Sequence, residues 1–165
     1  MWDSIGMDQL LMSKDVDTTK NVILYMLGKM WLFAEGKKKL MKLMFLLEYY
    51  NISSGKLSTK QFLGNDFYIY NYGVFSKDIM RSISTLIDQG KIQDGFPLIN
   101  IDSSKSSLEK RVKDKVDAIL DKFGKFSGYQ LEVSTLKMLG IEPHEKKKYF
   151  GQDIPQILNQ TKVAE

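Results

Sequence analysis

Three aspartates, Asp114, Asp117 and Asp121, are spaced so that their carboxylates share one face of an expected helix. Carboxylate oxygens at this spacing are the ligands that a hard cation such as Ca²⁺ prefers. Lysines alternate with the three aspartates, however, and this alternation is typical of a helix face in contact with water. We therefore interpret the aspartates as part of a solvated face and expect no metal site.

The composition excludes or disfavours several other kinds of chemistry. Among the 165 residues there is no cysteine and a single histidine, His144. Disulfide frameworks and thiolate chemistry are thus excluded, and histidine-dependent triads and histidine-rich zinc sites are disfavoured. The run Gly36-Lys-Lys-Lys39 has neither the preceding strand nor the upstream glycines of a phosphate-binding loop. We expect a protein that is not an enzyme and binds no cofactor.

One segment has the pattern of a binding surface, the expected helix over 37–50. On its helical wheel Lys38, Lys42, Phe45 and Tyr49 share one face. Cations interleaved with aromatic rings suit either a nucleic acid or an acidic, partly apolar protein surface. The structural alternative is that Phe45 and Tyr49 pack beneath another helix while the lysine stems extend to water. Both interpretations remain open from the residues alone.

The net charge is +4, and the predominance of lysine over arginine among the cations favours a protein partner over sequence-specific binding to DNA bases. The positive charge is concentrated in residues 20–60, and only Arg81 and Arg111 are arginines. Lysine lacks the planar fork with which arginine reads guanine edges. Contacts with nucleic acid, if they form, are expected from a dispersed set of cations: Lys77, Arg81, Lys91, Lys146, Lys147 and Lys148.

The hydrophobic periodicity predicts the elements that must position these residues. Apolar residues at helical spacing, Trp31 included, predict a first helix over 20–34, and a short helix is expected after Ser58. Residues 67–70 are strand-like, and Ser76 begins an amphipathic helix that Gly90 closes. Two short strands follow around Asp94-Gly95, with Pro97 before the second strand.

The remainder of the chain is expected to be helical. Ser106 with Glu109 and Ser127 with Gln130 have the spacing of capping boxes. Gly140 stops the second of these helices, and a last short helix begins near Asp153-Ile-Pro155.

These elements predict a mainly α fold with a small β-hairpin, built on a winged-helix-like core with additional C-terminal helices. An acidic segment over 1–19 precedes one helical domain over 20–140. Within that domain, residues 58–101 form the winged-helix-like region and residues 104–140 the C-terminal helical part. Residues 141–165 are expected to form a tail with short helices.

Several segments resemble the Panacea domain, a phage-associated family with many antitoxins. They are Lys39-Leu-Met-Lys-Leu-Met-Phe-Leu-Leu47, the aromatic run Phe67–Gly73, the helix end Gly90-Lys-Ile92, and Val116–Phe123 with Gly124–Leu131. Two positions depart from the family pattern. Gly73-Val74-Phe75 stands where the family usually has Gly-Pro-Val, and Ser134-Thr135 stands where a Thr-His pair is common.

The resemblance implies a non-enzymatic, antitoxin-like interaction protein that binds and neutralises a toxin-like protein partner. We expect the partner to contact Lys38, Lys42, Phe45, Tyr49 and the turn of Tyr72, Gly73 and Val74. The alternative is a winged-helix transcriptional regulator that binds DNA, with the C-terminal helices as dimer arms, and a homodimer is considered for either function. The start of the chain is acidic rather than cationic, and no apolar run approaches the roughly 20 residues that span a bilayer, so we expect a cytoplasmic protein without membrane contact.

Overall fold

The computed structural model describes residues 14–102, 104 and 107–164, with the side chains of 161–164 left undescribed. Helices account for 58% and strands for 11% of the structure, which confirms the mainly α prediction. The helical elements are α2 (Val16–Met30), η1 (Trp31–Ala34), α3 (Lys37–Tyr49), α4 (Lys77–Asp88), α5 (Lys110–Phe123), α6 (Gly128–Met138), η2 (Pro143–Tyr149) and α7 (Ile154–Ala164). The strands are β1 (Tyr50–Asn51), β2 (Lys56–Leu57), β3 (Tyr68–Tyr70), β4 (Gly73–Phe75), β5 (Ile92–Gln93) and β6 (Ile99–Asn100).

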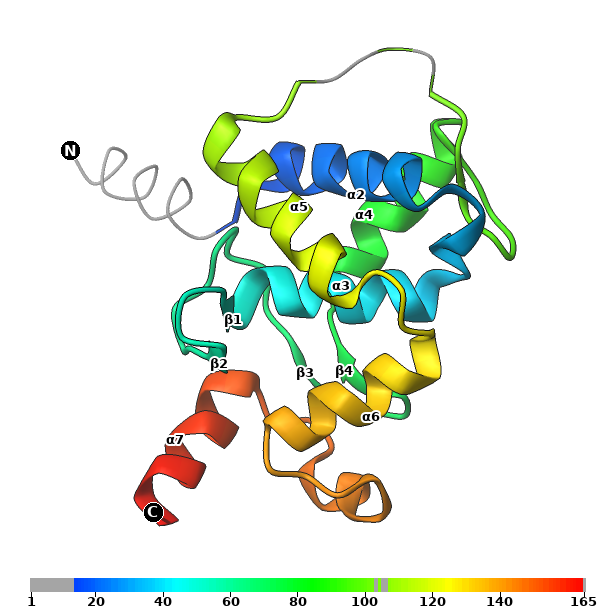
Figure 1. The fold of residues 1–165 in the computed structure, drawn as a ribbon. Coiled ribbons are helices and arrows are strands. Elements are labelled where there is room, and N and C mark those ends of the chain that lie inside the picture. The colour runs from blue at the N-terminus through cyan, green and yellow to red at the C-terminus, as the bar shows by residue number, and fades with distance from the viewer. Residues whose placement is uncertain (1–13, 103, 105–106, 165) are drawn as a thin grey trace, which may run out of the picture.

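Helix α3 runs through the centre of the molecule (Figure 1). Every residue from Lys39 to Tyr49 is buried. Helices α4 and α5 contact α3 on the side that α2 also covers, and α6 and β4 contact it from the other side (Figure 1). The wheel of α3 therefore does not divide into a core face and a water face, because neighbouring elements cover the whole helix.

Among the described residues, β1 pairs with β2, β3 with β4 and β5 with β6, each as a two-stranded antiparallel sheet. In the β3–β4 hairpin Ile69 pairs with Val74 and Tyr70 with Gly73. Gly73 has a φ of +87°, and a Cβ at this position would lie 3.3 Å from Cγ of Glu132. Glycine is thus required at this turn both for its backbone conformation and for the close approach of α6.

Most helix ends lie where the capping residues predict them. The hydroxyl of Ser76 accepts a hydrogen bond from the Ile79 N–H at 3.2 Å, and Ser127 with Gln130 forms the expected capping box of α6. The expected start of α5 was too early: Ser106 lies outside the described residues, and the helix begins at Lys110. Helix α2 begins at Val16 and ends at Met30, so Trp31 belongs to η1 and is exposed rather than part of the core stripe.

The winged-helix description of residues 58–101 is not confirmed. Helix α4 leads directly into the β5–β6 hairpin, as expected. The short helix expected after Ser58 is absent, and residues 58–67 form an irregular loop with bends. The backbone of this loop is fixed by a buried carboxylate, that of Glu48, instead of by helical hydrogen bonds. The structure thus supports a mainly α fold with small hairpins. None of the described helices has the length and apolar character needed to cross a membrane.

Candidate functional site

The basic-aromatic stripe expected on α3 is not a continuous exposed surface. Phe45 and Tyr49 are buried and pack on one another with ring centroids 5.4 Å apart. Lys42 is 1% exposed, and only Lys38 reaches the surface. The prediction of an exposed partner-binding stripe is therefore corrected for Lys42, Phe45 and Tyr49, because α3 is covered on all sides. The two aromatic rings are buried, as the structural alternative expects, but they pack on Phe67 in the loop before β3 rather than beneath a helix. The Lys42 stem does not extend to water.

The Lys42 ammonium group instead holds the turn between β3 and β4. Its Nζ donates hydrogen bonds to the backbone carbonyl of Tyr72 and, at 2.7 Å, to that of Val74. These carbonyls flank Gly73 on both sides, so one side chain fixes the turn. Four of the residues expected to bind a partner, Lys42, Tyr72, Gly73 and Val74, are thereby brought together.

A buried carboxylate from α6 completes this cluster. Glu132 Oε1 lies 2.6 Å from Lys38 Nζ, and its Oε2 lies 3.2 Å from Lys146 Nζ. Lys146 also donates to the carbonyl of Asn71 at 2.6 Å. We call Lys38, Lys42, Lys146 and Glu132 the turn cluster, and it joins α3, the hairpin turn, α6 and η2.

Burial and neighbouring charges shift the pKa values of two groups in the turn cluster. Burial lowers the pKa of Lys42 to about 7; Glu132 opposes this shift, and the nearby Lys38 and Lys146 ammonium groups add to it. For Glu132, burial acts to raise the pKa, but hydrogen bonds and charges from Lys38 and Lys146 outweigh it and leave the pKa below its usual value. Glu132 is therefore ionised at neutral pH, and Lys42 titrates close to neutrality.

Two exposed tyrosines lie over the turn cluster. Tyr72 is 67% and Tyr129 69% exposed. The Lys38 Nζ lies 5.1 Å from the ring centroid of Tyr72 and 5.7 Å from that of Tyr129, within cation–π range of both. We call Lys38, Tyr72 and Tyr129 the turn surface. It retains two of the residues expected from the sequence and adds Tyr129.

Sequence reasoning missed Tyr129 and Glu132. Both lie on α6, far in sequence from the hairpin turn. The only local signal was Glu132 itself, an acidic residue beside the apolar residue Leu131. Helical spacing alone does not show which residue of another element would contact Glu132. The contact between α3 and α6 that brings the two residues to Lys38 is a property of the tertiary fold.

The cations expected to contact nucleic acid do not form a uniformly free set. Arg81 lies 3.9 Å from Asp78, and Lys148 lies 3.2 Å from Glu145. Lys146 is bound to Glu132. Lys77 and Lys147 are exposed, and Lys91 is half-buried. The neutralised cations weaken the electrostatic attraction that a phosphate backbone requires.

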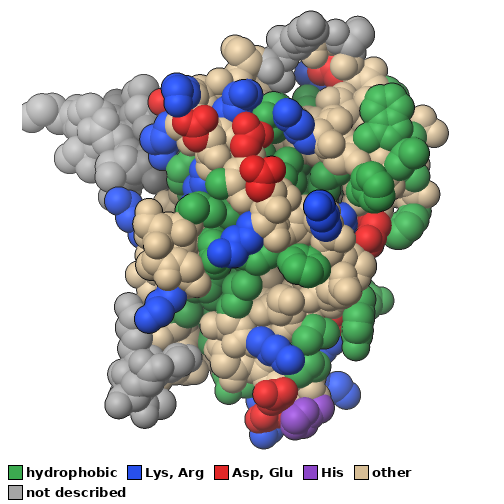
Figure 2. Space-filling model, in the orientation of Figure 1, with side chains coloured by type: hydrophobic (Ala, Val, Ile, Leu, Met, Phe, Trp, Pro, Cys, Tyr) green, Lys and Arg blue, Asp and Glu red, His purple; other side chains and the backbone are tan. Residues whose placement is uncertain are grey.

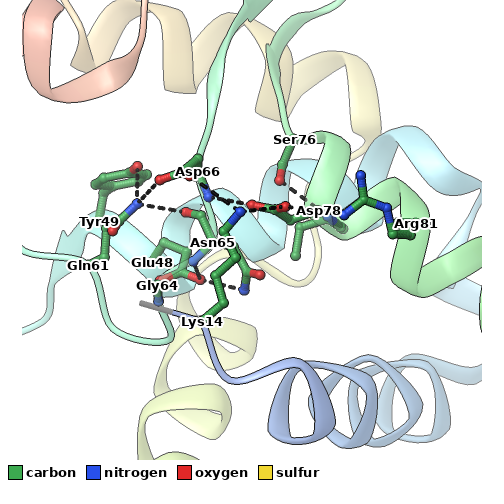
Figure 3. A network of polar contacts seen from close by, with 11 residues as sticks. Lys14, Glu48, Tyr49, Gln61, Gly64, Asn65, Asp66, Ser76, Asp78 and Arg81 are labelled. Atoms are coloured by element: carbon green, nitrogen blue, oxygen red, sulfur yellow. Dashed lines mark hydrogen bonds and ion pairs between the residues drawn. The ribbon is translucent and has the colours of Figure 1, made fainter. Parts of the chain in front are cut away.

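A separate polar network serves the fold (Figure 3). Glu48 accepts hydrogen bonds from the backbone N–H groups of residues 62–65 and from the Asn65 side chain, at 2.7–3.1 Å. Lys14 lies 3.0 Å from Asp78 and 3.6 Å from Asp66. These contacts tie the loop before β3 to α3 and to the start of α4, and each polar group has a partner within the chain.

Two of the three aspartates on α5 have partners within the chain. Asp114 pairs with Lys110 at 2.7 Å, and Asp117 accepts a hydrogen bond from the Tyr25 hydroxyl at 2.5 Å. Within the described part of the chain, no group of three acidic, histidine or cysteine side chains is arranged to hold a metal ion.

Comparison of the chain with models of known protein families, with curated proteins and with solved structures finds no significant match. The resemblance to the Panacea domain therefore stays a prediction.

Proposed function

We propose that the protein is a non-enzymatic interaction protein of the antitoxin type, which binds and neutralises a protein partner through the turn surface. The observation that carries the proposal is the Lys38 ammonium group between two exposed tyrosine rings. Tyrosine offers a large apolar area together with a polar end, and aromatic residues are enriched in the energetically dominant parts of protein interfaces.

The charges around the turn surface indicate an acidic partner. Three lysines surround one carboxylate in the turn cluster, and Lys147 lies exposed on η2 beside Lys146. A positive patch speeds the encounter with a negative one and sets the orientation of docking. A partner that presents a carboxylate beside an apolar side chain would meet Lys38 and the tyrosine rings together.

The turn surface is held in place before a partner arrives. Lys42 fixes the carbonyls on both sides of Gly73, and Lys146 fixes that of Asn71. A surface that is ordered in the free protein loses less conformational entropy on binding. The buried lysine therefore contributes to binding indirectly, by positioning Tyr72.

The resemblance to the Panacea domain supports the same surface. Lys42 belongs to the helical segment that carries the resemblance, and Tyr72 and Gly73 end the aromatic segment that carries it. In this fold Lys42 hydrogen-bonds the turn, so the two segments meet at one place. Val74, which stands where the family usually has proline, is one of the two residues whose carbonyl Lys42 binds.

A growth assay tests the proposal. The protein encoded by the adjacent open reading frame is expressed alone and together with this chain, and we expect growth to stop in the first case and to recover in the second. The double variant Tyr72→Ala, Tyr129→Ala should lose this rescue because both rings are removed. Its control, Lys77→Glu on the exposed face of α4, should rescue as the wild type does. Rescue by the double variant, or an adjacent protein that is harmless alone, would contradict the proposal.

The DNA-binding alternative makes a different prediction. A winged-helix regulator should retard duplex DNA at low salt, with a log–log salt slope near −0.9 for each phosphate contacted. We expect no retardation, because Arg81, Lys146 and Lys148 face carboxylates and the tip of the β5–β6 hairpin carries Phe96 rather than a cation. Salt-sensitive retardation that Lys77→Glu abolishes would favour the DNA-binding alternative.

A further inference from the structure

A second surface, distinct from the turn surface, is apolar and protrudes from the fold. Trp31, Leu32 and Phe33 are consecutive residues of η1, and Phe96 lies at the tip of the β5–β6 hairpin; all four are 69–77% exposed. The backbone N–H of Leu98 donates to the carbonyl of Glu35 at 2.7 Å and joins the two segments. We call Trp31, Leu32, Phe33 and Phe96 the apolar ridge. Figure 2 shows hydrophobic side chains gathered on the side of the molecule where Figure 1 places the connection from α2 to α3.

The apolar ridge is held out of the core by a constrained backbone. Trp31, the first residue of η1, and Glu35, which follows η1, have φ values of +50° and +55°. Residues with a Cβ rarely adopt this region. The buried Lys39 donates from Nζ to the carbonyl of Phe33 at 2.7 Å, and the Glu35 carboxylate accepts from the Gly128 N–H at 3.0 Å. A segment with unfavourable backbone dihedral angles that is held by hydrogen bonds on both sides is typical of functional sites.

Two grooves adjoin the apolar ridge. One, of about 250 Å³, is lined by Trp31, Leu32 and residues 97–100 of the hairpin. The other, of about 700 Å³, is lined by Phe33 of η1, by residues of α2 and α5 that include Leu120, and by Gly124 and Lys125 after α5. A ridge beside a groove is the shape that a twofold axis makes self-complementary, since each copy places its ridge in the groove of the other.

We propose that the apolar ridge and its grooves form a homodimer interface, with a second copy of this chain as the occupant. With roughly 200 Å² for a fully exposed large side chain, the ridge together with the outward-facing Ile99 and Ile101 offers about 800 Å² of apolar surface. That area exceeds the ordinary largest apolar patch of a monomer and equals what one partner contributes to a standard interface of about 800 Å² per side.

The charges near the ridge fit a second copy better than a charged partner. Lys37 pairs with Asp94 at 3.3 Å beside the ridge. The larger groove is lined by two lysines and two aspartates: Lys29, Lys125, Asp117 and Asp121. Because these charges balance within one chain, two copies can meet without like-charge repulsion, and an anionic membrane surface finds no excess of cations there.

Sedimentation equilibrium of the full-length chain tests the dimer. We expect a mass twice the 19.0 kDa of one chain, and monomers for the variant Leu32→Glu, Phe96→Glu. The matched control Tyr72→Glu, Tyr129→Glu places the same charges on the turn surface and should remain dimeric. Circular dichroism of each variant verifies that the fold is retained, which is expected because all four side chains are exposed.

The absence of cysteine from the chain allows a second, independent measurement. A single cysteine introduced as Leu32→Cys should be cross-linked between copies by a flexible bismaleimide, whereas Tyr129→Cys should not. A wild-type chain that stays monomeric at a protein concentration about 100 times a micromolar dissociation constant would overturn the proposal. Equal cross-linking of the two variants would overturn it as well. Monomers that bind vesicles of phosphatidylserine and phosphatidylcholine through Trp31 would show that a membrane surface covers the ridge instead.

Discussion

Replacement of Glu48 by alanine is expected to lower the free energy of unfolding by about 4 kcal/mol. The Glu48 carboxylate is buried and accepts hydrogen bonds from four backbone N–H groups and from the Asn65 side chain. Without it, the N–H groups of residues 63–65 lose their acceptor in a loop that has no helix or sheet to supply another. The Phe62 N–H keeps only the Glu48 main-chain carbonyl, and the Asn65 side chain keeps only the Thr19 hydroxyl. The residues from 62 to 65 should then detach from α3, and with them the anchoring of β3.

Urea denaturation followed by circular dichroism measures this effect, with Glu109→Ala as the control for an exposed glutamate. The corresponding decrease in Tm is about 10 °C for a chain of this size. Glu48→Gln tests the hydrogen-bonding argument at constant volume, because its amide NH₂ would meet N–H donors where a carboxylate oxygen now accepts. We expect it to be destabilised as well, and a Glu48→Gln variant as stable as the wild type would contradict this account of the loop.

Replacement of Lys42 by methionine is expected to cost stability by an amount that grows with pH. Burial lowers the pKa of Lys42 to about 7 from the 10.5 of an exposed lysine. Between these values the unfolded chain binds a proton that the folded chain lacks, so the Lys42 contribution to stability rises with pH. Below pH 7 the fold must bury a charged ammonium group, whereas above pH 7 a neutral amine still donates to the turn carbonyls.

The difference in unfolding free energy between wild type and Lys42→Met should therefore increase by about 2 kcal/mol from pH 7 to pH 9. Guanidinium denaturation of both proteins across this range gives the difference directly. Lys77→Met, at an exposed position of α4, serves as the control and should show no such trend. A constant difference for Lys42→Met would mean that Lys42 keeps an ordinary pKa and that the turn cluster is open to water.

The comparison of α4 with α3 shows what could be predicted from the sequence. Helix α4 lies at the edge of the core, and its residues Ile79, Ile83 and Leu86 are buried as the helical wheel predicts. The charged residues of α3 predicted a face in contact with water. No such face exists, because α3 is covered on all sides. Lys39 donates to the carbonyl of Phe33 in the preceding η1, and Lys42 donates to carbonyls of the β3–β4 hairpin, which is distant in the sequence. Sequence patterns carry no information about such acceptors.

The candidate site, too, was predicted from the sequence only in part. The sequence placed Lys42 and the Tyr72-Gly73-Val74 turn in one expected partner-binding surface, on the resemblance and the basic-aromatic stripe, and did not predict the contact between them. Tyr129 joins them only because α6 packs on α3. The sequence did not predict the apolar ridge, because Trp31 continues the helical spacing of α2. In addition, no glycine or proline marks the change of backbone direction after Met30.

Isothermal titration calorimetry of the purified adjacent-gene protein into this chain tests the central claim most directly. We predict binding to the wild type and to Lys77→Glu with the same Kd. The variant Tyr72→Ala, Tyr129→Ala should raise the Kd about 100-fold, because two central aromatic contacts are lost. Equal Kd values for the double variant and the wild type, or no heat of binding to the wild type, would contradict the claim that the turn surface binds a protein partner.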